Sequence, residues 1–170
     1  METEKLADSC QLFYHILFCV IMNDFAFHFS HKFMHCEWLY KEFHYIHHQY
    51  NNPIGISAEY SHPVEYVFAT IIPATLGPIL LGKNIHITTA WAWLIWGIGA
   101  TIEQHCGYEL PFSPYGILPF SFSAQYHDFH HTRYKYNYSS NFTFWDTIFG
   151  DNQEYFQYYI NQYNKKYLRS

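Results

Sequence analysis

The apolar residues of this chain gather in three long stretches that alternate with polar, histidine-rich segments. The stretches cover residues 12–29, 64–81 and 85–102. A bilayer span takes about 20 apolar residues, so each stretch is short for a span and could instead be a buried core helix. Asn23 and Asp24 interrupt the first stretch. Pro73 and Gly77-Pro78 interrupt the second, which predicts a kinked helix or one that does not fully cross.

Only Gly82-Lys83-Asn84, a turn signal, separates the second stretch from the third. Two helices with so short a link form a hairpin that returns the chain to the side it left. The polar segments 30–63 and 107–170 then share one side, with His62 and His105 at the ends of the hairpin and His86 on the surface of the opposite side. We therefore expect an all-α integral membrane bundle of about three spans with a histidine-rich helical cap. The expected divisions are an N-terminal tail (1–11), a membrane-embedded domain (12–150) and a polar C-terminal tail (151–170).

Composition agrees with a membrane protein of one domain. The chain has 170 residues, of which 22% are aromatic and only 14% charged, against roughly 25% charged in soluble domains. The net charge of -5 and the absence of a basic block argue against nucleic acid as a partner. The four cysteines form no CxxC pair, so neither a disulfide scaffold nor a thiolate zinc site is expected.

Histidines occur in three arrays, one HxxxH at residues 31–35 and two HxxHH at residues 44–48 and 127–131. On a helix, residues three or four apart share a face, so each array forms one patch. Imidazole suits iron, zinc, copper and nickel, but a tetrahedral zinc needs only about four ligands. Ten histidines suit two ions with about five ligands each. The predicted metal ligands are His31, His35, His44, His47, His48, His62, His105, His127, His130 and His131.

The remaining histidines and acids receive other roles. His15 and His28 have no partner pattern and are expected to be structural. A single ExxH and no HExxH argue against soluble di-iron carboxylate proteins and zinc peptidases. Acids near the arrays are expected to accept hydrogen bonds from imidazole N–H groups, and Glu109, four residues after His105, could orient that ring or offer an oxygen ligand. These acids are Glu59, Glu65, Glu103, Glu109, Asp128 and Asp146.

The order HxxxH, HxxHH, HxxHH resembles that of the fatty acid hydroxylase/sterol desaturase superfamily. Three further blocks are similar to those of the 4-methylsterol monooxygenases within it: AEYSHPVE at 58–65, HCGYELP at 105–111 and NYSSNFTFWDTIFG at 137–150. The resemblance covers about residues 22–150, nearly the whole chain.

This resemblance implies a function and a location. It implies two non-haem irons that activate dioxygen, with electrons from NAD(P)H through a reductase and cytochrome b5. The substrate would be the 4-methyl group of a sterol precursor, and the enzyme would lie in the endoplasmic reticulum membrane with its histidine boxes in the cytosol. Family members have a further span before the first box, so three spans here would leave the N-terminus lumenal. The alternatives are another lipid hydroxylase or desaturase of the superfamily, or a shortened, catalytically impaired relative.

Overall fold

The computed structural model describes residues 8–116, 119–121 and 123–168, and these residues form an all-helical fold. Their one β-feature is an isolated bridge between Ser121 and Phe142. The predicted all-α class is confirmed. The α-helices and short 3-10 or π turns (η) are α1 Ser9–Met34, α2 Glu37–Glu42, η1 His44–Gln49, η2 Gly55–Glu59, α3 Pro63–Glu65, η3 Tyr66–Ile71, α4 Ile72–Leu81, η4 Gly82–Asn84, α5 Ile87–Gln104, η5 Pro114–Gly116, α6 Ala124–Arg133, α7 Phe144–Phe149 and α8 Gln153–Tyr167.

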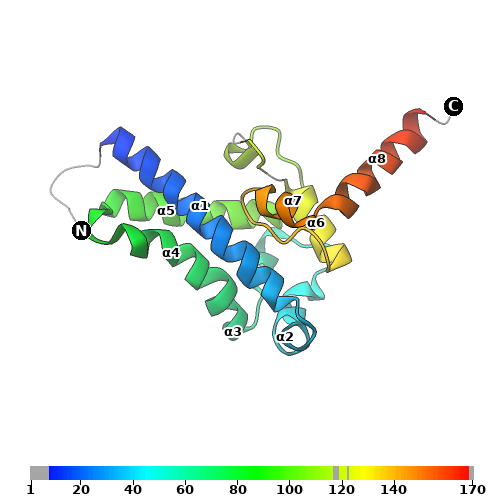
Figure 1. Cartoon of the computed structure of the whole chain (residues 1–170), viewed down its shortest axis with the longest axis horizontal. Coiled ribbons are helices and arrows are strands. Elements are labelled where there is room, and N and C mark those ends of the chain that lie inside the picture. The colour runs from blue at the N-terminus through cyan, green and yellow to red at the C-terminus, as the bar shows by residue number, and fades with distance from the viewer. Residues whose placement is uncertain (1–7, 117–118, 122, 169–170) are drawn as a thin grey trace.

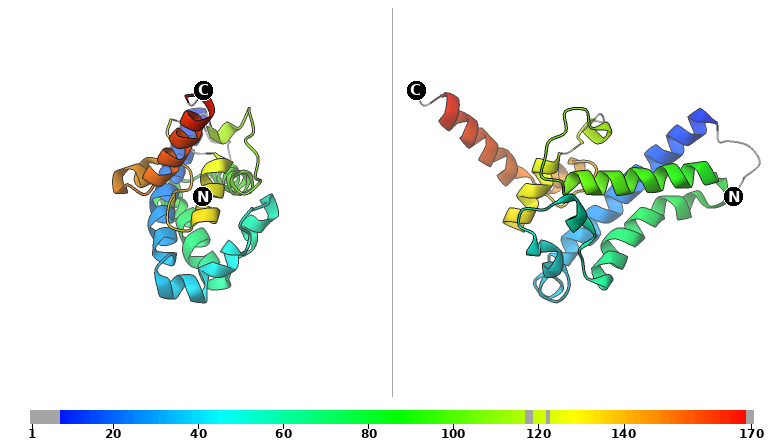
Figure 2. Two further views of the ribbon diagram at one scale, coloured as in Figure 1. Left: turned by 90° about the vertical axis from the view of Figure 1, so that its right-hand side faces the viewer. Right: turned by 180° about the vertical axis from the view of Figure 1, so that it is seen from behind.

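Helices α1 and α5, together with the helical run Pro63–Asn84 that contains α4, form the body of the molecule (Figure 1). The turn η4 joins α4 to α5, and Gly82 begins it at a φ of 55°, a region that favours glycine. From this turn α4 and α5 separate towards the opposite end of the molecule, while α1 packs mainly on α4 (Figures 1 and 2). The predicted hairpin is confirmed, and the histidine-rich segments lie at the end away from η4.

The contact between α1 and α4 depends on one small residue. A Cβ atom built on Gly77 would lie 2.7 Å from the Cα of Cys19, closer than real Cβ atoms come. The two backbones therefore approach to a distance that only glycine allows, as in many membrane helix pairs. Cys19, Val20 and Trp93 form a small buried cluster beside this contact.

The prolines of the second stretch distort the helix without ending it. Residues Pro63–Asn84 form one helical run, with the π turn η3 just before Pro73. Proline lacks an N–H and its ring crowds the preceding turn, and a π turn relieves such crowding. Pro78 likewise leaves the carbonyl of Ala74 without its usual donor. The indole Nε1–H of Trp93 on α5 supplies one at 2.8 Å, so the distortion also joins the two helices.

Two helical runs in the described part of the chain are long and apolar enough to cross a membrane, Ser9–Met34 and Pro63–Asn84. Only 22% of each apolar window is buried, so most of its side chains face outward, unlike those of a soluble core helix. Ile79 on α4 is 70% exposed and Ile95 on α5 is 68% exposed. Such outer faces are stable in lipid rather than in water. The third stretch forms α5, which is not one of these two runs, so two of the three expected spans are long and apolar enough to cross.

Asp24, which interrupts the apolar pattern of α1, has a structural partner. Its side chain is 1% exposed, and its Oδ1 accepts hydrogen bonds from the backbone N–H groups of Asn141, at 2.7 Å, and Phe142, at 3.0 Å. A buried carboxylate is tolerated when donors satisfy it in this way. Asp24 therefore fastens the loop that follows α6 to the middle of α1.

The C-terminal helix lies apart from this body, and the first residues of the chain are not described. Residues 1–7 of the expected N-terminal tail lie outside the described residues, and α1 begins at Ser9. The expected polar C-terminal tail forms α8, which has no buried residue and extends away from the bundle (Figure 1).

Candidate metal centre

Nine of the ten predicted ligands converge in two groups at the end of the bundle away from η4. Each group offers ring nitrogens that all lie within 4.8 Å of one another. The first group comprises His31, His35, His44, His48 and His130, and the second comprises His47, His105, His127 and His131. The two groups adjoin, because the ring centroids of His48 and His131 are 4.6 Å apart.

Each HxxHH array contributes to both groups, which differs from the expected single patch per array. The array at residues 44–48 forms the 3-10 helix η1, in which His44 and His48 turn to the first group and His47 to the second. On α6, His130 joins the first group, while His127 and His131 join the second. One turn of helix therefore lies between the two groups and contributes to each.

The spacing of the Nε2 atoms fits one metal ion in each group. In the first group, the Nε2 atoms of His35 and His44 are 2.9 Å apart. In the second, the Nε2 atom of His127 is 3.0 Å from that of His105 and 3.1 Å from that of His131. Nitrogen ligands about 2.1 Å from one metal ion and about 90° apart lie about 3.0 Å from each other. The donor set and its spacing both fit bound metal.

The outer nitrogens of these rings define the tautomer. A carbonyl oxygen can only accept, so a ring whose Nδ1 faces a carbonyl carries its proton there and turns an unprotonated Nε2 inward. Four of the nine rings are held in this way, with Nδ1–O distances of 2.8 Å for His31 to Tyr138, 3.3 Å for His47 to Tyr60, 2.8 Å for His105 to Thr101 and 2.6 Å for His130 to Tyr136.

Burial keeps the rings neutral, the form that binds metal. Burial, followed by the neighbouring His105, lowers the pKa of His47 to about 3. Burial also lowers the pKa of His105 to about 4. The pKa values of the other cluster histidines outside α1 are lowered for the same reason, namely those of His35, His44, His48, His127, His130 and His131.

The segment 136–142 supports the first group from outside, and Asp146 holds this segment. The carboxylate of Asp146 is 0% exposed. It accepts hydrogen bonds from the backbone N–H groups of Tyr138 and Ser139, both at 3.0 Å, and from the hydroxyl of Tyr126 at 2.7 Å. Because the carbonyl of Tyr138 in turn binds His31, Asp146 positions a ring that it does not touch.

A cavity of about 500 Å³ leads from the helices to both histidine groups. Its walls come from α1, α4 and α5 and include apolar side chains such as Phe27, Trp93 and Ile98. Rings of both groups close its inner end, His31 and His44 from the first and His47, His105 and His127 from the second. Its volume lies within the range of about 300–1,000 Å³ for small-molecule sites.

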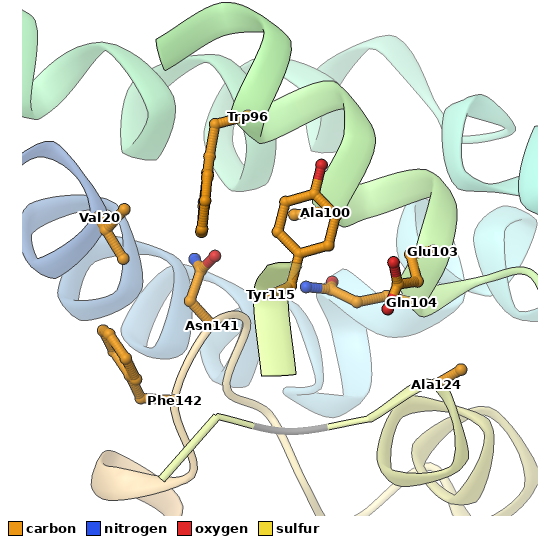
Figure 3. A pocket seen from close by; sticks show the side chains of 9 residues that line it. All are labelled: Val20, Trp96, Ala100, Glu103, Gln104, Tyr115, Ala124, Asn141 and Phe142. Carbon is orange, nitrogen blue, oxygen red and sulfur yellow. The ribbon is translucent and has the colours of Figure 1, made fainter. Parts of the chain in front are cut away.

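A second cavity beside α5 is too small for a substrate. Figure 3 shows the side chain of Tyr115 reaching α5 near Ala100, beside Trp96 and Gln104. The volume of this second cavity, about 10 Å³, is enough for about one water molecule. Ala100, Gln104 and Asn141 line both cavities, so this contact forms part of the wall of the larger one.

Several other expectations are changed by the structure. His62 joins neither group, because its Nδ1 accepts the backbone N–H of Val64 and so caps α3. Glu109 does not orient His105, since it is exposed and accepts the N–H of Gln125. His86 was expected on the surface but is 5% exposed, and its Nδ1 accepts the N–H of Thr88 at the start of α5.

The remaining expected residues also have definite places. His28 lies outside both groups, where its Nδ1 is 3.3 Å from Asp146 Oδ1. Glu65 lies beside His44, with Oε1 2.8 Å from Nδ1. Asp128 is half-buried on α6, and within the described ranges its carboxylate has no hydrogen bond to a cluster ring. Glu59 lines the large cavity and Glu103 the small one, while His15 is half-buried on α1.

Comparison with known proteins gives one family. The family model described as fatty acid hydroxylase matches residues 16–151. The chain is 42% identical over 159 residues to methylsterol monooxygenase 2-1 of Arabidopsis thaliana, which covers 82% of this chain and 56% of the relative. It is 40% identical to very-long-chain aldehyde decarbonylase GL1-11 of Oryza sativa subsp. indica (82% and 53%) and 39% identical to methylsterol monooxygenase 1 of Rattus norvegicus (82% and 47%).

The chain thus spans about half the length of the curated relatives that it matches. No solved structure matches it.

Proposed function

The chain belongs to the fatty acid hydroxylase family, and on that premise we propose that it acts as a membrane non-haem di-iron monooxygenase on the 4-methyl group of a sterol precursor. The observation that carries the proposal is the convergence of nine inward-facing histidines in two groups at the end of one largely apolar cavity. The curated names of two relatives, methylsterol monooxygenases, support the choice of substrate.

The proposed metal ligands are the five histidines of the first group and the four of the second. Two bound irons would supply the activation of dioxygen and the oxidising power for a C–H bond. The protein residues hold the ring nitrogens unprotonated and directed inward. They also keep water away, because the nine rings are buried or nearly so.

The cavity supports a lipid as the substrate. Alanines, Phe27 and Trp93 provide an apolar surface for a rigid hydrocarbon, while the rings of the two histidine groups lie at one end. A substrate held along this wall presents one end to the metal groups and leaves the rest in apolar surroundings. Positioning of this kind removes much of the entropic barrier to reaction.

We further propose that electrons come from NAD(P)H through cytochrome b5 and its reductase. We also propose that the protein lies in the endoplasmic reticulum membrane with its histidine boxes in the cytosol. The support is the resemblance described above and the position of both histidine groups at one end of the bundle.

A second candidate is an aldehyde-processing or hydroxylating activity on very long acyl chains. The relatives named aldehyde decarbonylases favour it, because they match this chain nearly as closely as the methylsterol monooxygenases. A long acyl chain would also fit an apolar cavity.

Expression of the chain in cells that lack 4-methyl sterol oxidation tests the proposal. Loss of accumulated 4-methyl sterols supports it. Persistent 4-methyl sterols together with altered fatty acids or aldehydes support the second candidate. Persistent 4-methyl sterols with fewer than two irons per purified chain contradict the proposed mechanism. A His127→Ala variant, which removes a ligand, serves as the inactive control.

A further inference from the structure

The carboxylate of Glu65 lies between the cavity and the first histidine group. Glu65 ends the short helix α3, lines the cavity and is 5% exposed. Its Oε1 is 2.8 Å from the Nδ1 of His44, in a close contact that is not a well-aligned hydrogen bond. Its Oε2 is buried and has no hydrogen-bond partner.

A buried carboxylate oxygen without a donor is unfavourable and therefore uncommon in native proteins. Among the described residues that line the cavity, Glu65 Oε2 is the one side-chain oxygen in this condition. The cavity also contains the carboxylate of Glu59, but that residue is exposed and reaches water. The unsatisfied oxygen thus marks a place where a ligand can donate a hydrogen bond.

We propose that Glu65 Oε2 forms a hydrogen bond with the substrate hydroxyl. Glu65 would thereby select sterols in which the carbon that bears this hydroxyl adjoins the carbon that bears the methyl group. This inference rests on the proposed function and adds a specificity-determining residue to it.

The position of His44 explains why a hydroxyl at this point would place the methyl group correctly. One nitrogen of the His44 ring, Nε2, belongs to the first metal group, and the other, Nδ1, faces Glu65. A hydroxyl bound to Oε2 therefore lies in the same cavity as the His44 ring, which Glu65 touches. A substituent on the neighbouring ring carbon can then reach the part of the cavity that His31 and His44 line.

A hydroxyl is well suited to the unsatisfied oxygen of Glu65. A hydroxyl can both donate and accept a hydrogen bond, so it pairs with Oε2 whether or not the carboxyl group carries a proton. A hydrogen atom in place of the hydroxyl would leave Oε2 unsatisfied. A site built to bind a hydroxyl discriminates strongly against analogues that lack it.

Saturation binding with two labelled 4-methyl sterols tests the proposal, using the full chain purified in detergent. One ligand carries a 3-hydroxyl and the other has no oxygen at carbon 3. The wild-type chain should bind the hydroxyl form about tenfold to a hundredfold more tightly than the deoxy form. In Glu65→Leu this preference should vanish. In Glu65→Gln, whose amide can also hydrogen-bond a hydroxyl, most of the preference should remain.

Iron content and thermal unfolding are measured for each variant, so that a folding defect is recognised. Glu154→Gln, which removes an exposed carboxylate on α8, should retain the wild-type preferences. Equal affinity of the wild-type chain for the hydroxyl and deoxy forms would overturn the assignment of Glu65. An unchanged hydroxyl preference in well-folded Glu65→Leu would also overturn it. Failure of the wild-type chain to bind either sterol would instead contradict the proposed function, and this inference with it.

Discussion

Replacement of His47 by alanine should remove one iron and leave the other. His47 is 7% exposed and belongs to the four-histidine group. The variant leaves His105, His127 and His131 in that group and leaves all five ligands of the first group unchanged. We therefore expect iron to fall from about two to about one per chain, with loss of turnover.

The size of the effect follows from the role of the ring. Loss of an outer partner that merely orients a ligand costs about 10–100-fold in metal affinity, so loss of a ligand should cost more than about a hundredfold, or about 2.7 kcal/mol. Membrane insertion should be unaffected, because η1 lies outside both apolar helical runs.

The assay is iron per chain by mass spectrometry on protein purified in detergent with limiting free iron. His62→Ala is the matched control, because His62 precedes α3 outside both groups and its ring serves as a helix cap. It should retain two irons and lose only about 1 kcal/mol of stability.

Two results would refute the reasoning. Retention of two irons in His47→Ala would show that this ring is not a ligand. Loss of an iron from His62→Ala would show that His62 is a metal ligand and not only a helix cap.

Three further changes have predictable outcomes. Asp146→Asn replaces one of the two carboxylate oxygens with an N–H₂ group that faces the N–H or O–H groups of its partners. It should lower the free energy of unfolding by about 1–3 kcal/mol and weaken iron retention in the five-histidine group. Thermal melts and iron analysis measure the two effects, and wild-type values in both would contradict the prediction. Gly77→Ala introduces a methyl group 2.7 Å from the Cα of Cys19, so it should destabilise the bundle by about 1–3 kcal/mol and lower its unfolding temperature. An unchanged unfolding temperature would show that α1 and α4 do not pack so closely. Metal-free protein should lose stability as the pH falls below about 6.5. Burial lowers the pKa values of His47 and His105 in the folded chain to about 3 and 4, so only the unfolded chain takes up protons in this pH range. Equal midpoints of urea unfolding at two pH values either side of 6.5 would argue against buried neutral rings.

The sequence alone indicated much of the helical framework. Apolar stretches and the Gly82-Lys83-Asn84 link predicted the hairpin of α4 and α5, and the structure confirms it. The prolines predicted distortion of the second helix, and the π turn η3 lies just before Pro73. What the pattern did not show is that Trp93 supplies the donor missing at Ala74, because that contact depends on the register between two helices.

Acidic residues in the apolar and loop segments were harder to interpret. In the sequence, Asp24 only interrupts an apolar stretch. In the structure its carboxylate accepts hydrogen bonds from two backbone N–H groups more than a hundred residues away in the chain. The spacing of Glu109 and His105 predicted that Glu109 would orient the histidine ring. Instead the chain turns at Gly107, with a φ of 74°, and Glu109 accepts a hydrogen bond from the backbone N–H of Gln125. Local spacing does not reveal partners that lie across the fold.

The sequence by itself determined that histidines at helical spacing would be numerous enough for two metal ions, since residue type and spacing are local properties. Only the tertiary structure decided how nine of these rings divide, with His47 turned away from His44 and His48 and with His62 left as a helix cap. The physical reason is that a metal site is defined by where Nε2 atoms meet. Their positions depend on the 3-10 geometry of η1 and on how the ends of α1 and α5 meet α6, which no spacing within a single segment can specify.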